Sequence, residues 1–390
     1  MARINPKDAL LCLGHDEAIH EHDGAMMPPL VQTSLFAKPS VAALIEGLGQ
    51  EHRHHVYTRG QNPTVEVLEK KLASLERGEA CKCFASGMAA VSAVLTGLLE
   101  SGDHVLFVNQ IYGPTLQLAA HLARFGIQHD RILEPNPEAV ARAIRPNTRL
   151  IYVESPGTML FRMVDLAQLT SLARERNIRT AMDNTWATPL FQKPIEQGVD
   201  LVIHSCTKYI GGHSDVVAGA VIGPEALMTK LFYNAFLLFG GALAPFDAWL
   251  LIRGLRTLPT RMVRHHQDGL KVARFLEAHP AVRRVFHPLV RGEDRALAEK
   301  QLTGCSGLFS FELDTDRHEP VWAFIDRLKL FRIGISWGGV ESLAVTPNRG
   351  TNQAALEKLG IPAGTVRLSV GLEGPDSLIE DLDRALKGFP

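Results

Sequence analysis

The sequence predicts an α/β protein with a mostly parallel sheet flanked by helices, a smaller α+β C-terminal domain and an extended N-terminal arm. Short apolar, β-rich runs alternate with helix-like segments in the first two thirds of the chain, as expected for strands buried on both faces. A proline-punctuated stretch near the N-terminus has no helical or strand period. The chain has 390 residues, of which 46% are hydrophobic, and this length exceeds the usual size of one domain.

The predicted arm comprises residues 1–55, because residues 27–36 within it are irregular. The pattern then changes to a helical one. Apolar residues at helical spacing over residues 65–75 predict the first helix, and Gly78 is well placed to end it. The alternation of strands and helices begins after this helix.

Four β-rich runs predict the buried strands of the sheet, and helix-like segments separate them. One such segment, residues 165–177, carries leucines on one helical face. Ligands of a parallel sheet bind beyond the carboxyl ends of its strands. The predicted strands are residues 104–108, 150–153, 179–182 and 201–204.

A change of pattern near residue 250 predicts the limit between two domains. The large domain would comprise residues 56–250 and the small domain residues 251–390, which begin with a basic helical segment. Strands are predicted at residues 307–312 and 366–370, and an amphipathic helix from about residue 376.

Composition excludes several classes of protein. The net charge is -1 without long blocks of one sign, so neither nucleic acid nor a membrane surface is an expected partner. The N-terminus lacks a signal-peptide pattern and no segment has the ~20 apolar residues of a membrane span. Five scattered cysteines indicate a reducing compartment, so a cytoplasmic location is expected. For Cys81 and Cys83, two partly buried thiols are favoured over a zinc site, and no metal is predicted.

Lys208 and Asp183 carry the predicted chemistry. Lys208 follows one predicted strand, and Asp183 ends the strand before it. A lysine amine can form a Schiff base with the aldehyde of pyridoxal phosphate, and a carboxylate can hold the pyridine nitrogen protonated so that the ring accepts electrons. The pair therefore predicts a pyridoxal phosphate site in which Lys208 is also the catalytic base.

Two further segments predict the site of the cofactor phosphate. Ser86 can cap a helix and donate its hydroxyl, Gly87 allows close approach of the backbone, and Met88 offers the next amide. Ser205 and Thr207 are expected to alternate along a strand and to donate to the same phosphate. Taken alone, these residues also fit a capped helix and a polar strand face, but the lysine that follows favours the cofactor site.

Six ordered segments resemble the cysteine and methionine metabolism family of fold-type I pyridoxal phosphate enzymes, and the resemblance runs from about residue 28 to the C-terminus. It implies the fold of a fold-type I pyridoxal-phosphate-dependent transferase with a seven-stranded sheet, and a small amino acid as substrate. The segments are residues 57–64, 85–90, 183–186, 205–212, 253–258 and 336–343.

The resemblance also implies an active site shared between subunits. Tyr57 and Arg59 would bind the phosphate in the neighbouring subunit, with a catalytic part for Tyr57, and a homotetramer built as a dimer of dimers is usual in the family. Tyr112 would stack on the pyridine ring, contact substrate and take part in catalysis. By sequence alone Arg59 is an exposed loop arginine, and Tyr112 is a loop aromatic packed on the core.

Arg367 is the predicted site of the substrate α-carboxylate. The resemblance assigns it this role, with the backbone near Ser336 and Trp337 completing the site. An arginine within an apolar strand is also costly unless it meets an anion, and guanidinium geometry suits a carboxylate. His213 follows the lysine segment and is expected to contact residues of the site rather than the ligand itself.

Within the family, the resemblance favours the branch that cleaves cystathionine by β-elimination to homocysteine, pyruvate and ammonia, a reaction of methionine biosynthesis and trans-sulfuration. Ser336 with Trp337 and the Glu-Ser-Pro-Gly segment at residues 154–157 are typical of that branch. Residues 60–64 are closer to the γ-acting alternatives, which are cystathionine γ-lyase, cystathionine γ-synthase and methionine γ-lyase. Intact Lys208 and Asp183 oppose a third alternative, a non-catalytic protein on the same fold.

Overall fold

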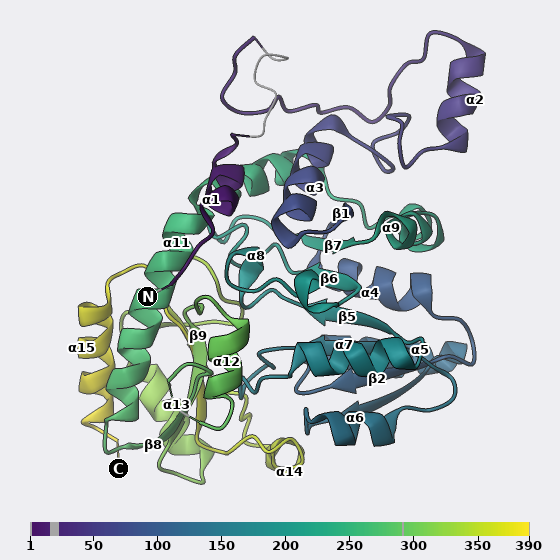
Figure 1. Ribbon diagram of the computed structural model, residues 1–390. Coiled ribbons are helices and arrows are strands. Elements are labelled where there is room, and N and C mark those ends of the chain that lie inside the picture. Colours follow the sequence, from purple (N-terminus) through teal and green to yellow (C-terminus); the bar gives the residue numbers. More distant parts are fainter. Residues whose placement is uncertain (1, 16–22, 291, 390) are drawn as a thin grey trace.

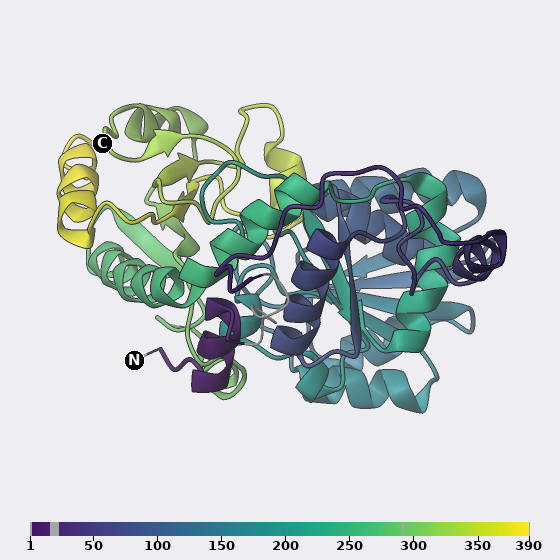
Figure 2. The ribbon, with the colours of Figure 1, turned by 90° about the horizontal axis from the view of Figure 1, so that it is seen from above.

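The computed structural model describes residues 2–15, 23–290 and 292–389. It consists of a large and a small lobe, each built around its own sheet, and the long helix α11 (Pro245–Glu277) runs along both (Figures 1 and 2). This is the predicted α/β architecture with a second, smaller α+β unit. No helix in the described ranges is long and apolar enough to cross a bilayer.

The sheet of the large lobe has seven strands in the order β1-β7-β6-β5-β4-β2-β3. Strands β2 to β6 pair in parallel, whereas β7 runs antiparallel to both of its neighbours. All four strands predicted for this sheet are present. The strands are β1 (Ala80–Phe84), β2 (His104–Val108), β3 (Gln128–Ile132), β4 (Thr148–Glu154), β5 (Arg179–Asp183), β6 (Leu201–His204) and β7 (Gly219–Gly223).

Helices cover both faces of this sheet because the strands alternate their buried side chains between two cores. Phe107 and Tyr152 face one core, and their strand neighbours Leu106 and Val153 face the other. The first core is covered by α4 (Gly87–Leu98), α5 (Gly113–Leu122), α9 (Glu225–Leu231), the π-helix Phe232–Phe236 and α10 (Leu237–Phe239); the second is covered by α6 (Pro137–Ala143) and α7 (Leu166–Glu175). Helices α3 (Pro63–Glu76) and α8 (Thr188–Phe191) and the 3-10 turns Ala123–Phe125 and Ile195–Gln197 complete the lobe.

The predicted helix end at Gly78 differs in detail from the structure. Helix α3 ends at Glu76, and Arg77 adopts the left-handed conformation with φ 66°. Gly78 follows and donates its amide to the carbonyl of Ala73 at 2.9 Å, which closes the helix end. Glycine is needed here because a Cβ would lie 2.3 Å from Cγ2 of Ile222 on β7.

The N-terminal arm contains two helices that the sequence did not predict, α1 (Pro6–Leu13) and α2 (Val41–Gly49). Residues 27–36 are irregular as expected, apart from an isolated bridge between Leu35 and Tyr57. Residues 16–22 of the predicted arm lie outside the described residues. Figure 1 shows α2 at the edge of the large lobe, far from α1.

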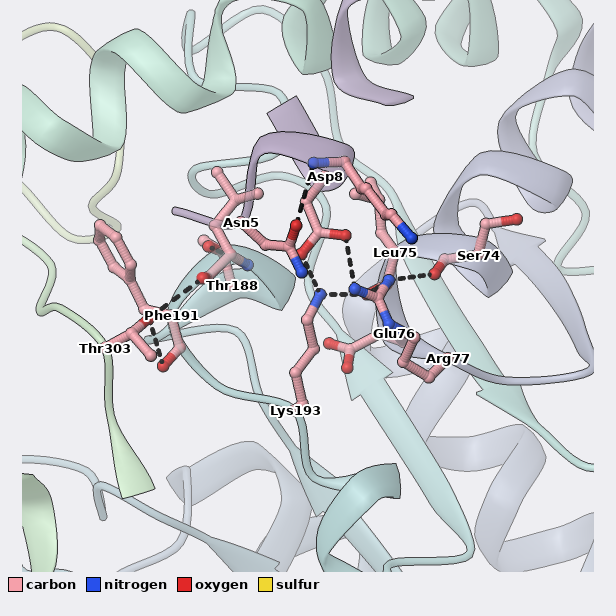
Figure 3. Close-up of polar contacts among 12 residues, drawn as sticks. Asn5, Asp8, Ser74, Leu75, Glu76, Arg77, Thr188, Phe191, Lys193 and Thr303 are labelled. Atoms are coloured by element: carbon pink, nitrogen blue, oxygen red, sulfur yellow. Dashed lines mark hydrogen bonds and ion pairs between the residues drawn. The ribbon is translucent and has the colours of Figure 1, made fainter. Parts of the chain in front are cut away.

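Helix α1 is attached to the large lobe by a buried acid. The carboxylate of Asp8 lies 2.8 Å from Nη2 of Arg77 and 2.9 Å from Nζ of Lys193 (Figure 3). Asn5 caps the same helix, since its side chain accepts the amide of Lys7 at 3.0 Å. Because Asp8 is almost completely buried, the two cations offset the cost of removing its charge from water.

The small lobe contains a five-stranded sheet in the order β10-β11-β12-β9-β8. The predicted strands near residues 307–312 and 366–370 correspond to β9 and β12, and the predicted C-terminal helix to α15. The domain limit near residue 250 stays a prediction and falls within the unbroken α11. The elements are β8 (Val282–Phe286), α12 (Arg295–Gln301), β9 (Leu308–Leu313), α13 (His318–Asp326), β10 (Arg332–Ile333), β11 (Leu343–Val345), α14 (Gln353–Glu357), β12 (Thr365–Ser369) and α15 (Pro375–Leu386).

Helix α11 packs directly on the turn that carries the predicted catalytic lysine. This turn, residues 205–212, is called the lysine turn below. A Cβ on Gly254 of α11 would lie 2.5 Å from the carbonyl oxygen of Ile210 in that turn. Arg261 of the same helix donates to the carbonyl of Tyr209 at 2.7 Å. The helix therefore fixes the main chain on which the lysine stands.

We expect Gly254→Ala to destabilise the protein, although alanine favours a helix interior over glycine by roughly 1 kcal/mol. The new Cβ meets main-chain oxygens that cannot rotate away, so the free energy of unfolding should fall by about 2 kcal/mol. The thermal midpoint measures this effect. Gly49→Ala is the control, because its Cβ meets nothing within 4 Å. An unchanged midpoint for Gly254→Ala would show that α11 and the lysine turn can separate freely.

Candidate active site

The lysine turn begins where β6 ends. Strand β6 stops at His204, and the amide of Lys208 then donates to the carbonyl of Ser205 at 3.1 Å. The amide of Gly212 in turn donates to the carbonyl of Lys208 at 2.8 Å. The expectation that Ser205 and Thr207 alternate along a strand is therefore wrong, because these hydrogen bonds fold the chain into a turn.

The side chain of Lys208 lies between the two lobes. Its Nζ donates to Oγ of Ser336 at 2.6 Å and lies 5.4 Å from the centre of the Trp337 ring. Burial, together with the positive charge of Arg367, lowers the pKa of Lys208 from 10.5 to about 8, against the opposing effect of Asp183. A substantial fraction of the amine is therefore neutral near pH 8, as a nucleophile or a base requires.

Asp183 is the last residue of β5 and is connected to the lysine turn through Thr185. Its Oδ1 accepts the amide of Thr185 at 2.9 Å, and Oγ1 of Thr185 accepts the amide of Ser205 at 2.8 Å. Burial raises the pKa of Asp183, while Thr185, His204 and Lys208 act in the opposite direction. Strand ends that are distant in sequence thus place the predicted acid and lysine in one site.

The N-terminus of α4 lies against the lysine turn. Ser86 caps the helix, since its Oγ accepts the amide of Ala89 at 3.0 Å. The amides of Gly87 and Met88 make no hydrogen bond within the described ranges. A Cβ on Gly87 would lie 2.9 Å from Oγ of Ser205, so glycine allows this close approach. The result is a cradle of free amides and a hydroxyl group.

Thr207 differs from Ser205 in its hydrogen bonds. Its Oγ1 donates to the carbonyl of Ala218 at 3.2 Å and accepts the amide of the same residue at 3.0 Å. The hydroxyl of Ser205 has no hydrogen-bond partner in the part of the chain that the structure describes. The predicted role of both hydroxyls toward a phosphate stays a prediction, and Ser205 is the freer donor of the two.

These residues fit pyridoxal phosphate. A helix N-terminus with free amides suits a phosphate dianion, and the amides of Gly87 and Met88 provide one beside Ser205. Lys208 supplies a partly neutral amine and Asp183 a buried acid for the ring nitrogen. When bound, this cofactor supplies an electron sink that makes the bonds at the substrate Cα labile.

Arg367 lies on β12 of the small lobe and reaches the same site. Its Nη2 donates to the carbonyl of Ser336 at 3.3 Å. Burial lowers the pKa of Arg367 to about 10, and Tyr112 acts in the opposite direction. No carboxylate pairs with Arg367 within the described residues, so this half-buried guanidinium is available to an anionic ligand.

The loop that carries Ser336 and Trp337 touches the lysine turn. Ser336 has a φ of 84° and Gly338 a φ of 87°. A Cβ on Gly338 would lie 2.8 Å from the amide nitrogen of Tyr209. The left-handed conformation at Ser336 is unusual for a residue with a side chain and is a form of strain that functional sites often hold.

Tyr112 precedes α5, and its side chain is 51% exposed. Its amide donates to Oε1 of Glu154 at 2.7 Å. Sequence reasoning used Glu154 only as part of a family segment and missed this contact. The sequence pattern could have indicated it, because an acid that directly follows the apolar run 150–153 lies at the carboxyl end of its strand, as Asp183 does.

Tyr57 and Arg59 are not brought to the lysine within one chain. Both are exposed, and the guanidinium carbon of Arg59 lies 5.7 Å from the centre of the Tyr57 ring. The described residues provide no contact between either side chain and Lys208, Asp183 or Arg367. Their predicted role in a neighbouring subunit stays a prediction.

His213, Cys81 and Cys83 are the remaining residues that the sequence analysis considered. His213 contacts the carbonyl of Gly211 through Nδ1 at 2.7 Å, which places it at the end of the lysine turn. Cys81 and Cys83 are buried free thiols on β1. In the ranges that the structure covers, no group of three or more His, Cys, Asp or Glu side chains is suited to hold a metal ion.

Comparisons with known proteins identify the family of this chain. The family model described as Cys/Met metabolism PLP-dependent enzyme matches residues 11–387. A cystathionine gamma-lyase of Bacillus subtilis (strain 168) is 39% identical over 375 residues, covering 95% of this chain and 96% of the relative. A cystathionine beta-lyase of Lactococcus lactis subsp. cremoris is 39% identical over 373 residues, covering 93% and 94%.

A solved structure shows the same similarity in three dimensions. The crystal structure of metB from Corynebacterium glutamicum superposes with a TM-score of 0.91 at 32% identity, and the match covers 98% of each chain. The fold class and the family expected from the six sequence segments are thereby confirmed. This chain belongs to the family of pyridoxal-phosphate-dependent enzymes of cysteine and methionine metabolism.

Proposed function

We propose that this protein is a carbon–sulfur lyase that cleaves L-cystathionine by β-elimination, with water, to homocysteine, pyruvate and ammonia. The observation that carries the proposal is the convergence of Lys208 and Arg367 on Ser336. A partly neutral amine and a half-buried guanidinium on opposite lobes match the Cα proton and the α-carboxylate of one amino acid. Relatives with carbon–sulfur lyase names support the reaction class.

Each residue has a defined part in this proposal. Arg367 binds the α-carboxylate and so orients the Cα–H bond toward Lys208. Nζ of Lys208 accepts the Cα proton, and Ser336 orients that amine through the 2.6 Å hydrogen bond. Asp183 keeps the ring nitrogen of the cofactor protonated. The cradle at Gly87, Met88 and Ser205 holds the phosphate.

Two sequence features favour β-cleavage. The segment Glu-Ser-Pro-Gly at residues 154–157 lacks the asparagine that is typical of γ-acting members of the family. The second feature is Trp337, whose ring centre lies 5.4 Å from Nζ of Lys208. A γ-elimination must also remove a proton from Cβ. A γ-acting enzyme is the second candidate, because residues 60–64 are closer to its pattern.

We also propose that the active site is completed by a second copy of the chain in a homotetramer. Tyr57 and Arg59 are exposed beside the N-terminal arm, and within the described residues their side chains contact each other but not Lys208, Asp183 or Arg367. An arginine and a tyrosine suit a phosphate group as ligand. A cytoplasmic location stays a prediction.

The products of cystathionine cleavage distinguish the two candidates. We expect the purified protein to release pyruvate and homocysteine in equal amounts, because removal of one Cα proton suffices for β-elimination. Chromatographic measurement of the 2-oxo acids and thiols checks this. Release of 2-oxobutyrate and cysteine would establish γ-cleavage instead. Cysteine, methionine and O-acylated homoserines serve as comparison substrates.

The rate of cofactor capture should report the lowered pKa of Lys208. Only the neutral amine attacks the aldehyde, and the pKa near 8 makes the amine mostly protonated below pH 8 and mostly neutral above it. We expect the rate at which the apoenzyme gains the absorption band of covalently held cofactor to rise with pH and to level off above about pH 8. Lys208→Arg keeps the charge and should give no such band. A rate that still rises toward pH 10 would contradict the lowered pKa.

Substitution of Arg367 should weaken substrate binding selectively. Loss of a charge-assisted, bidentate contact corresponds to roughly 2–3 kcal/mol, so Arg367→Ala should raise KM about 30-fold to 150-fold while leaving the cofactor band unchanged. Steady-state kinetics and absorption spectra measure both effects. Arg284→Ala, at a largely exposed arginine of β8, is the control. An unchanged KM would remove Arg367 from the substrate site.

A further inference from the structure

A second acid, Glu154, stands beside Asp183 at the carboxyl ends of the strands β4 and β5. The register of β4 and β5 pairs Glu154 with Asp183, so the two side chains project from the same face of the sheet. Glu154 is only 8% exposed. Two neighbouring carboxyl groups shielded from water are costly when both are charged, and the proposed reaction uses only Asp183. Glu154 therefore needs a separate explanation.

The ring of Tyr112 has little to hold it in place. Within the residues that the structure describes, its side chain makes no hydrogen bond and no ring contact, and it is 51% exposed. The main chain around it is well fixed by contrast. Ile111 is buried, the carbonyl of Tyr112 accepts the amide of Thr115 at 3.0 Å, and its amide binds Glu154 at 2.7 Å.

We propose that Glu154 is a positioning residue that fixes the peptide of Tyr112 through this amide and so sets the direction of the phenol ring in the active site. The inference rests on the proposed function and on the expected stacking of Tyr112 on the cofactor ring. The main chain sets the orientation of the Cα–Cβ bond, and the rotamers of the ring start from that bond. Glu154 provides a fixed reference, because its own carbonyl accepts Nδ2 of the buried Asn109 at 2.8 Å.

A protonated Glu154 fits this role. Burial, followed by the charge of Asp183, raises the pKa of Glu154 well above its usual range. The charged form of Asp183 is stabilised by more neighbours than that of Glu154, because Thr185, His204 and Lys208 all act to lower the pKa of Asp183. A neutral carboxyl group at Glu154 still accepts the amide of Tyr112 and leaves Asp183 as the charged acid.

Three substitutions in the holoenzyme test the role of Glu154. Glu154→Gln keeps the shape and the acceptor, so it should behave like the wild type. Glu154→Met removes the oxygen that accepts the amide of Tyr112. Glu154→Asp shortens the side chain by one methylene group and so moves the accepting oxygen away from that amide. The control is Asp381→Leu, which removes another buried carboxylate that accepts main-chain amides, those of Lys329, Leu330 and Phe331.

Three measurements separate positioning from stability. In Glu154→Met and Glu154→Asp we expect hydrogen exchange in residues 110–116 to be about tenfold faster, the circular dichroism of the cofactor band to change, and kcat to fall about tenfold with little change in KM. Asp381→Leu should lower the thermal midpoint alone. Wild-type exchange in residues 110–116 and wild-type dichroism in both Glu154 variants would overturn the inference.

Failure of the proposed function is distinguishable from failure of this inference. If the wild type does not cleave cystathionine, the proposed reaction is wrong. Hydrogen exchange at residues 110–116 needs no substrate and still decides whether Glu154 holds the peptide of Tyr112. A loss of activity in Glu154→Gln equal to that in Glu154→Met would also overturn the inference, because the acceptor is retained in the first variant.

Discussion

The burial of one amine between two lobes is the interaction on which the active site depends. Nζ of Lys208 is partly shielded from water by the lysine turn on one side and by Ser336 and Trp337 on the other. Burial and the nearby Arg367 both favour the neutral amine. An exposed lysine on the same turn would be almost fully protonated at neutral pH and would be a poor nucleophile. The relative position of the two lobes therefore affects the pKa of Lys208 and its reactivity as a nucleophile.

Glycines make this arrangement possible because they let main-chain segments touch. Gly254 of α11 and Gly338, in the loop that carries Ser336 and Trp337, both pack on the lysine turn, and neither leaves room for a Cβ. Gly87 plays the same part at the N-terminus of α4, against Ser205. The main chain at the lysine is thus confined by three elements that come from separate parts of the sequence. Such confinement reduces the motion of groups that must be aligned during a reaction.

The sequence predicted those elements whose own residues carry the pattern. Strands β2, β4 and β6 contain continuous apolar runs, β5 has a shorter one that ends at Met182, and α3, α7 and α15 have clear helical spacing. Strand β3 was missed because its sequence Gln-His-Asp-Arg-Ile is polar and lies at the edge of the sheet. Helices α1 and α2 were missed because they are short, and α1 depends on the contacts of Asp8 with Arg77 and Lys193 rather than on its own propensity.

The sequence by itself determined the chemical groups of this protein: an amine after one strand, an acid at the end of the strand before it, a capped helix start and an arginine in an apolar strand. These follow from local patterns, because strand ends, caps and turns are encoded by neighbouring residues. Tertiary structure alone decided that Ser336 lies between Lys208 and Arg367, and that Glu154 holds the amide of Tyr112. Such contacts arise from sheet register and from the packing of one lobe on another, and these join residues that the linear sequence keeps far apart.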